Sequence, residues 1–251
     1  MNIQIFRKRD QAQGAFDGGK IIENKPIGFP QEGGLLKPFS NLFYWAHAWS
    51  DYGGLIDVHP HQGFEIMSFV LKGTIEHYDN KYERWLQLHE GDVQIIRAGS
   101  GITHAERFLP GSHIFQIWVD PDLAKTMQQP ASYDDYSADS FPLNKVNGHE
   151  EKIFNGDGGP LKMDAPGLQF KELNLKPGSY SFDVEDGKTH ANYLIEGKLN
   201  LGEEELGTDD FFQGLGGNYQ FEVIEKTRLF QVIAPKTLDY KTYAQLQGIS
   251  G

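Results

Sequence analysis

The sequence predicts an all-β protein, and three observations support this class. Glycine and proline are frequent, with 29 and 12 residues in a chain of 251. Short runs rich in β-branched and aromatic residues lie between them. Long segments with the period of an amphipathic helix are scarce. A chain of this length can bury a substantial core as one large domain or two small ones.

The expected strands are short and follow one another closely. Residues 2–6 alternate weakly between apolar and polar side chains and predict a first strand, and a second is expected near residues 20–22. Further strands are predicted where β-branched, apolar and aromatic residues cluster: residues 43–49, 65–71, 93–96 and 113–119.

Helices are expected at only two places. Residues 122–129 precede Pro130, which would end a helix, and residues 238–246 could form a short terminal helix. Residues 130–150 are polar and interrupted by proline and glycine, so they predict a connection between two lobes.

Composition excludes several kinds of site. The chain has no cysteine, so it cannot form a disulfide framework, a thiolate metal site or a cysteine nucleophile. Its net charge of −12 argues against direct binding to nucleic acid, because the phosphate backbone attracts basic surfaces. The first residues form no apolar run long enough for a signal peptide or a membrane span. We therefore expect a cytoplasmic protein that does not bind membranes.

Two pairs of polar residues predict a metal site. His59 and His61 are two residues apart, as are His104 and Glu106. In an extended chain residues i and i+2 point to the same face, so each pair projects together. A folded sheet that brought the pairs together would offer three imidazoles and one carboxylate to a metal ion.

A single His-x-His pair is a weak signal, because a strand with surface or structural histidines has the same pattern. The context is more specific. The spacing Gly53-x5-His59-x-His61-x3-Glu65-x7-Gly73 resembles the first motif of the cupins, and Gly91-Asp-Val-Gln opens a stretch like their second motif. A longer set of segments resembles the pirin branch of that superfamily: residues 59–65, 73–79, 91–94 and 98–106.

The resemblance implies a bicupin, with two jelly-roll β-barrels in tandem and few short helices. The expected domains are residues 1–130, which would bind the metal, and residues 131–251, a degenerate copy. Residues 68–77 align with residues 192–201, and the same register places Asp183 opposite His59 and Glu185 opposite His61. Because this second half has no imidazole pair, only the first barrel is expected to hold a metal.

The resemblance also assigns roles to the two candidate carboxylates. In general cupins the glutamate at the position of Glu65 is a metal ligand, whereas in pirins the carboxylate ligand comes from the later motif. This implies that His59, His61, His104 and Glu106 bind the metal and that Glu65 lies beside it. Either Glu106 or Glu65 could act as a catalytic base. His77 is expected to be a structural or cavity-edge histidine.

Such a ligand set leaves two open positions on a six-coordinate metal, where a substrate oxygen and O₂ could bind side by side. Fe(II) is favoured, with Ni, Cu, Mn or Zn as alternatives. Bacterial pirins are associated with quercetin 2,3-dioxygenase activity, so the resemblance implies a non-haem dioxygenase acting on a small aromatic flavonol. Aromatic residues are candidates for the pocket lining: Phe64, Phe69, Trp85, Phe108, Phe115 and Trp118.

Two other functions remain open at this point. One is a metal-dependent regulator that binds a protein partner, as in nuclear pirins, and the other is a different small-molecule enzyme with the same metal site. The native metal, the physiological substrate and the oligomeric state are not determined by the sequence.

Overall fold

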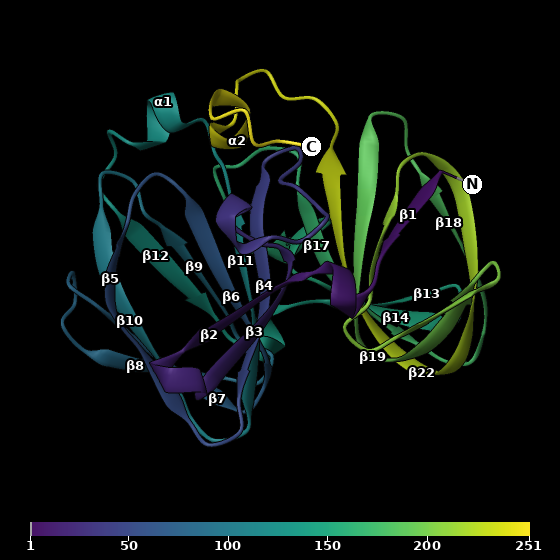
Figure 1. The fold of residues 1–251 in the computed structure, drawn as a ribbon, viewed down its shortest axis with the longest axis horizontal. Coiled ribbons are helices and arrows are strands. Elements are labelled where there is room, and N and C mark those ends of the chain that lie inside the picture. Colours follow the sequence, from purple (N-terminus) through teal and green to yellow (C-terminus); the bar gives the residue numbers. More distant parts are fainter. Residues whose placement is uncertain (1) are drawn as a thin grey trace. The chain divides into compact units, whose positions relative to one another are not determined.

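The regular secondary structure of the chain is almost entirely β-strand, which confirms the predicted all-β class (Figure 1). The structure is a computed structural model that describes residues 2–251. The described chain has two α-helices, each of a single turn, α1 (Leu123–Thr126) and α2 (Tyr243–Leu246). Both lie within the predicted helical segments. Short 3₁₀ turns occur at Lys8–Asp10, Asp17–Gly19, Pro30–Glu32 and Ala138–Ser140.

The chain divides into two compact units. We call the first barrel the unit formed by Gln11–Ser140, Met163–Pro166 and Asp239–Gly251. We call the second barrel the unit formed by the residues up to Asp10 together with Phe141–Lys162 and Gly167–Leu238.

The first barrel contains two sheets. The larger one has seven strands in the order β12-β9-β6-β11-β4-β3-β2, and the smaller one has the order β5-β10-β7-β8. These strands are β2 (Ala12–Phe16), β3 (Ile21–Ile27), β4 (Leu42–Ser50), β5 (Gly54–His61), β6 (Glu65–Lys72), β7 (Thr74–Asp79), β8 (Trp85–His89), β9 (Val93–Arg97), β10 (Ile102–Phe108), β11 (Ser112–Val119) and β12 (Ser132–Tyr136).

The second barrel has the same strand order in one continuous sheet. Its path is β1-β21-β19-β22-β17-β14-β13, and β18 and β20 pair with the other halves of β22 and β19. These strands are β1 (Ile3–Phe6), β13 (Leu143–Val146), β14 (His149–Ile153), β17 (Gln169–Leu175), β18 (Gly178–Val184), β19 (Lys188–Leu201), β20 (Glu204–Gly207), β21 (Phe211–Gly214) and β22 (Gly217–Pro235). A two-stranded ribbon of β15 (Asn155–Gly156) and β16 (Gly159–Pro160) is attached.

The predicted internal repeat is visible in this pairing. Strands β6 and β7 of the first barrel are separated at Gly73, whereas the single strand β19 runs through the equivalent Gly197. Both glycines have positive φ, 75° and 99°, and a Cβ on either would lie 3.0 Å or less from backbone of the adjacent strand or turn. Because only glycine tolerates both conditions, the chain can pass here from one part of the barrel wall to the other.

The observed units differ from the predicted division into 1–130 and 131–251. Strand β12 pairs with β9, so the first barrel continues to Ser140. Strand β1 pairs with β21, and the C-terminal segment from Asp239 packs in the first barrel. Residues 130–150 are therefore not the simple connection that their composition predicts: they contain β12, β13 and the start of β14.

The interior of the first barrel has a polar layer between two apolar clusters. Strand β6 contributes Val70, Ser68 and Ile66 to the interior in turn, because alternate residues share a face. Strand β11 likewise contributes an apolar, a polar and an aromatic side chain, Ile114, Gln116 and Trp118. A polar layer inside a barrel is energetically unfavourable unless its groups are hydrogen bonded.

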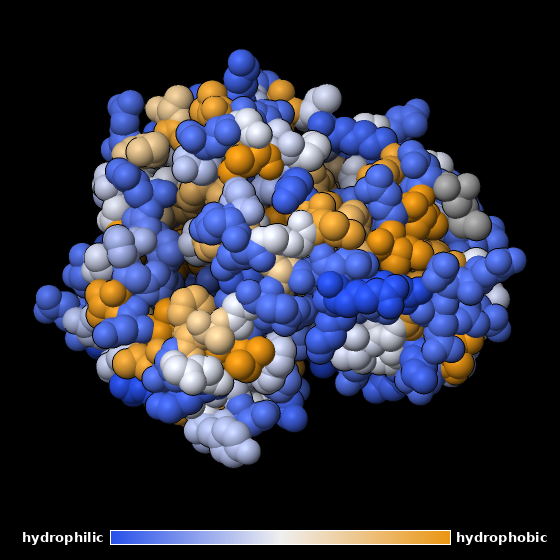
Figure 2. Space-filling model, viewed as in Figure 1, coloured by the Kyte–Doolittle hydropathy of each residue, from blue (hydrophilic) through white to orange (hydrophobic). Residues whose placement is uncertain are grey.

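The surface in Figure 2 is mostly hydrophilic, with separate hydrophobic patches, as expected from the high acidic content. Among residues 2–251, no helix is long and apolar enough to cross a membrane.

Candidate metal centre

A bulge in β5 turns the first histidine pair into the barrel. Strand β5 pairs with β10, and the register shifts so that His104 lies opposite His59 but Glu106 lies opposite Ile56. Strand β5 therefore has one residue more than β10 in this interval. Ile56 belongs to an interior apolar cluster, whereas the next two residues are exposed. The extra residue lets His59 face inward again, which is a known effect of β-bulges.

Three of the predicted ligands come together. Ring nitrogens of His59, His61 and His104 all lie within 4.8 Å of one another. The Nε2 atoms of His59 and His104 are 2.9 Å apart, and the three ring centroids are 4.4 to 4.7 Å apart. Among the residues that the structure describes, this is the one group of three or more such side chains with metal-binding spacing.

The environment keeps two of these imidazoles neutral. Burial, and then the nearby His59, lower the pKa of His61 to about 3. Burial also lowers the pKa of His104 well below its usual value, and the neighbouring histidines add to the effect. Neutral imidazoles are the form that binds metal ions, so the ring nitrogens are ready to act as ligands at pH 7.

Hydrogen bonding also favours metal binding. The Nδ1 of His59 lies 2.7 Å from the carbonyl oxygen of Asp57, so Nδ1 donates and Nε2 is left with a lone pair. The Nε2 of His61 is buried, and among the described residues it has no hydrogen-bond partner. The Nε2 of His104 lies 2.9 Å from that of His59, a distance that requires a shared proton or cation between the two nitrogens. Together with the unpartnered Nε2 of His61, this donor set fits a transition metal.

The fourth predicted ligand, Glu106, is held by two neighbours. Ser68 donates a hydrogen bond to its Oε1 at 3.1 Å, and the Nε2 of Gln116 donates to its Oε2 at 2.7 Å. Gln116 in turn accepts from the indole N–H of Trp118, whose ring packs edge-on against His61 with centroids 4.7 Å apart. The carboxylate lies outside the group of three nitrogens, so its role as a ligand remains a prediction. Each carboxylate oxygen of Glu106 keeps one further lone pair that could bind a metal ion or a proton.

The structure corrects the expectation that Glu65 lies beside the metal. Its carboxylate accepts backbone N–H groups of Asp164 and Ala165, at 2.7 and 2.8 Å, and Arg97 is 3.7 Å away. Alternation along β6 explains this position, because Ser68 faces the interior and Glu65 faces the opposite side. Burial raises the pKa of Glu65 to about 7. Glu65 anchors segment Met163–Pro166 within the first barrel, and these contacts favour Glu106 over Glu65 as the base.

Only part of the predicted aromatic lining is near the histidines. Trp118 contacts His61, and Phe64 packs against Trp118 at 6.0 Å. Phe108 belongs to the apolar cluster on the far side of the polar layer. Phe69 and Phe115 alternate with residues of the polar layer and therefore face the other side of their sheet. Trp85 stacks with the guanidinium of Arg107 at 4.1 Å and is 36% exposed.

Aromatic residues that the sequence did not single out complete the surroundings of Trp118. Phe29, Phe43 and Tyr44 lie with ring centroids 5.1 to 6.5 Å from its ring. Tyr243 of α2 packs on Phe43 at 5.6 Å. The terminal helix thus covers this aromatic cluster within the first barrel.

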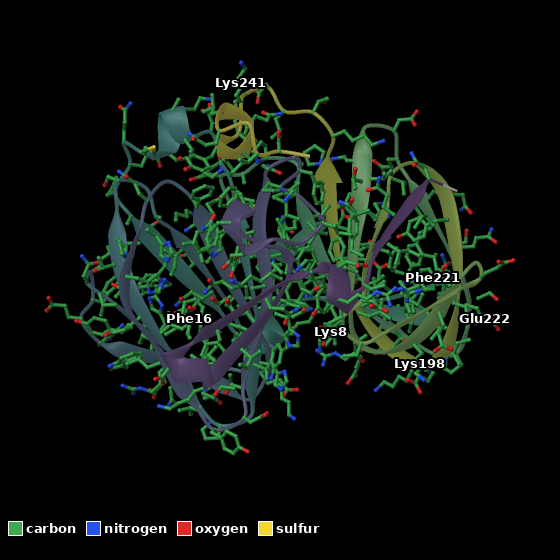
Figure 3. The ribbon with its side chains drawn as sticks, viewed as in Figure 1. Lys8, Phe16, Lys198, Phe221, Glu222 and Lys241 are labelled. Carbon is green, nitrogen blue, oxygen red and sulfur yellow. The ribbon has the colours of Figure 1, made fainter. Side chains whose placement is uncertain are left out.

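The second barrel has aromatic rings at the equivalent interior positions. Gly197 is the equivalent of Gly73, and the strand pairing that follows each glycine relates the two barrels. In this alignment Tyr219 occupies the position of His104, and Phe221 occupies the position of Glu106. Phe182 lies opposite Tyr219, as His59 lies opposite His104. Their ring centroids are 5.5 to 6.3 Å apart. Figure 3 shows Phe221 inside this barrel and its neighbour Glu222 at the surface.

This pairing corrects the predicted register by one residue. Asp183 was expected opposite His59, but the equivalent residue is Phe182. Asp183 is exposed and accepts a hydrogen bond from Asn218. A shift of one residue moves a strand side chain to the other face, which explains the difference.

The sequence reading missed Ser68 and Gln116, which hold Glu106. A signal was present, because each is a single polar residue inside an otherwise apolar run, 66–71 and 114–119. A buried strand places a polar side chain in its interior row only when a partner exists there.

Comparisons with known proteins match these observations. Residues 25–119 match the family model described as Pirin. Pirin-1 of Arabidopsis thaliana is 33% identical over 187 residues, which are 71% of this chain and 62% of that protein. This chain is similar to the pirin family. The match covers less than two thirds of the length of Pirin-1.

Two other similarities are to proteins of Escherichia coli. A protein of Escherichia coli named quercetin 2,3-dioxygenase is 43% identical over 68 residues, 26% of this chain and 29% of that protein. The bacterial pirin YhhW of Escherichia coli, in complex with nickel(II), has a TM-score of 0.74 and 20% identity. The alignment covers 94% of this chain and all of YhhW, and it shows that the two share a fold.

Proposed function

We propose that the first barrel binds one transition metal through His59, His61 and His104, with Glu106 as the fourth ligand. The observation that carries this proposal is the convergence of three buried or half-buried imidazoles whose ring nitrogens lie within 4.8 Å of one another. The position of Glu106 two residues after His104, in the same interior row of β10, supports its inclusion.

The donor set narrows the choice of metal. Three imidazoles favour Fe, Ni, Cu or Zn over Mg or Ca, and one carboxylate is compatible with Fe(II) and Mn as well. We propose Fe(II) as the working metal, because a three-histidine, one-carboxylate site with open positions suits O₂ chemistry. The nickel complex of the related bacterial pirin supports a single-metal site of this kind.

We further propose that the protein is a dioxygenase for a small aromatic substrate, with a flavonol such as quercetin as the first candidate. The similarity to the Escherichia coli quercetin 2,3-dioxygenase supports this choice. A bound metal would supply a centre at which a substrate oxygen and O₂ are held together. Trp118 and Phe64 would offer flat apolar surfaces to a planar ring.

Within this reaction Glu106 would accept a proton from a substrate hydroxyl. Ser68 and Gln116 each occupy one lone pair of its two oxygens and hold the group in one orientation. Such positioning is what general-base catalysis requires. The cytoplasmic location and any protein partner stay predictions.

Metal analysis followed by an O₂ assay tests the proposal. Wild type should hold about one metal per chain by mass spectrometry, His61→Ala should hold much less, and His190→Ala in the second barrel should match wild type. Metal-loaded wild type should then consume O₂ with quercetin and release carbon monoxide above a free-metal control. Equal metal content in wild type and His61→Ala would show that these histidines do not form the metal site. Metal binding without O₂-dependent product would leave the site with another substrate or a binding role.

A further inference from the structure

Two buried polar residues next to the histidine group have no part in the proposed ligand set. His77 and Asp79 lie on β7, which pairs with β10. In this pairing His77 is opposite Glu106, and Asp79 is opposite His104. Both side chains are almost fully buried, with exposures of 0 and 1%. Burying an imidazole and a carboxylate is unfavourable unless each has a specific partner.

Asp79 is held firmly and fixes one end of His77. Its Oδ1 accepts the backbone N–H groups of Lys81 and Tyr82, at 2.7 and 3.0 Å. Its Oδ2 lies 3.1 Å from the Nε2 of His77. An ionised carboxylate only accepts hydrogen bonds, so the Nε2–H of His77 donates to it. In the neutral imidazole this leaves the Nδ1 of His77 as an acceptor.

His104 has the complementary atom. Its Nε2 faces the Nε2 of His59 at 2.9 Å, so a shared metal would bind there and the proton of His104 would be on Nδ1. The Nδ1 atoms of His104 and His77 are both buried, and neither has a hydrogen-bond partner among the described residues. The two ring centroids are 5.4 Å apart. One unpaired donor and one unpaired acceptor thus lie on neighbouring rings.

We propose that His77 and Asp79 are positioning residues for His104. In the metal-loaded protein the Nδ1–H of His104 donates to the Nδ1 of His77, directly or through one buried water, and Nε2–H of His77 donates to Asp79. This chain fixes the tautomer and the ring orientation of His104 and makes its Nε2 a better ligand. The inference rests on the proposed metal centre and adds to it the group that tunes one ligand.

The second barrel provides an internal comparison. Counted from the two equivalent glycines, Leu201 occupies the position of His77, and it is buried in an apolar cluster. A purely structural requirement at this position is therefore met by leucine in a barrel that has no imidazole group. The polar pair occurs in the barrel that has the three histidines.

The test compares metal affinity in variants of the full chain, with Ni(II) as the probe in competition with a chelator. His77→Leu, which copies the second barrel, and Asp79→Asn should each weaken binding about 10- to 100-fold. The double variant should be no weaker than His77→Leu, because Asp79 acts through His77. His77→Gln should retain affinity within a few-fold, because its amide can donate to Asp79 and accept from His104.

A matched control and a second readout separate this role from a structural one. His190→Leu replaces a buried histidine of the second barrel and should leave nickel affinity unchanged. In Zn(II)-loaded wild type, nitrogen-15 NMR of the histidines should show His104 protonated at Nδ1 and bound to the metal through Nε2, a result that does not depend on any variant folding.

Several outcomes would overturn the inference. They are metal bound to the Nδ1 of His104, wild-type affinity in both His77→Leu and Asp79→Asn, or additive losses in the double variant. Absence of nickel binding by wild type would instead refute the proposed metal centre itself.

Discussion

The two barrels share one strand order and differ in what their equivalent strands place inside. Strand β10 of the first barrel contributes His104 and Glu106 to the interior, and the first half of β22 contributes Tyr219 and Phe221 at the same positions. The neighbouring strand adds His59 in one case and Phe182 in the other. The same strand framework can therefore hold either a polar site or a packed aromatic core at the same depth in the barrel.

The difference extends to the residues around these positions. In the first barrel Ser68 and Gln116 hold a carboxylate. Their equivalents Asn192 and Gln231 bond to each other at 2.8 Å, and Gln231 also donates to the hydroxyl of Tyr219 at 3.2 Å. The second barrel therefore keeps a polar pair, but its partners are uncharged. Since buried polar groups contribute little net stability, the charged version is best explained by the proposed site.

The largest effect is expected when the equivalent residues His104 and Tyr219 are each replaced by alanine. His104→Ala should lower metal affinity by more than about 100-fold, since a ligand matters more than a residue that supports a ligand. Tyr219→Ala should keep the metal but lose about 3–5 kcal/mol of unfolding free energy, because it leaves a cavity. Chelator competition and denaturant unfolding measure the two quantities. Loss of metal in Tyr219→Ala with the first barrel folded would contradict the comparison.

The second prediction compares Gln116→Leu with Gln231→Leu. Gln116→Leu frees Glu106 and Trp118 from their shared partner, so metal affinity should fall about 10- to 100-fold. Gln231→Leu should lower the free energy of unfolding by about 1–3 kcal/mol and leave metal affinity unchanged. Isothermal titration with Ni(II) and urea unfolding separate the effects. Equal metal affinity in both variants would mean that Gln116 does not position the site.

The third prediction concerns pH and the second barrel. Burial, with a smaller contribution from Lys171, lowers the pKa of His190 to about 4. Between pH 6.5 and 4 the unfolded chain binds this proton and the folded chain does not, so stability should fall as the pH falls through this range. The slope from this group is at most about 1.4 kcal/mol per pH unit.

His190→Gln isolates this contribution. Its side chain can still bond to the hydroxyl of Tyr219, which lies 3.2 Å from the Nδ1 of His190. Urea unfolding of the metal-loaded protein at pH 4.5 to 7.5 should show a shallower pH dependence in the variant than in wild type. Parallel curves for the two proteins would show that His190 does not titrate differently on folding.

The smallest effect on the site is expected from Glu65→Gln. Because Glu65 bonds to the backbone of Asp164 and Ala165, this variant should keep its metal and its turnover. An amide can accept from one N–H but presents its own donor to the other, so stability should fall by about 1–3 kcal/mol at low pH. The folded pKa of about 7 means that wild type binds an extra proton between pH 4.5 and 7. The wild-type advantage should therefore shrink as the pH rises through that window. A large loss of turnover with the metal retained would instead show that Glu65 acts as a base.

Much of the fold follows from local patterns. The alternation and aromatic content of residues 43–49, 65–71 and 113–119 predict β4, β6 and β11 closely. The helices are predicted in the right places but are only single turns, because propensity does not determine where packing ends a helix. The strands β12 and β13 are missed, since their residues are polar and gain their stability from edge pairing with β9 and β14.

The site, like the fold, is predicted in part by the sequence and decided in part by the tertiary structure. The sequence by itself determines that two residue pairs with i, i+2 spacing project from strands, and the resemblance to pirins combines them into one ligand set. Only the tertiary structure decides which carboxylate can take part. The sequence leaves open whether Glu65 or Glu106 acts as a base, but the register of β6 turns Glu65 outward to a backbone segment. The pairing of β10 turns Glu106 toward Ser68 and Gln116. Registers and bulges depend on contacts between strands far apart in the chain, and a shift of a single residue reverses the face of every side chain that follows.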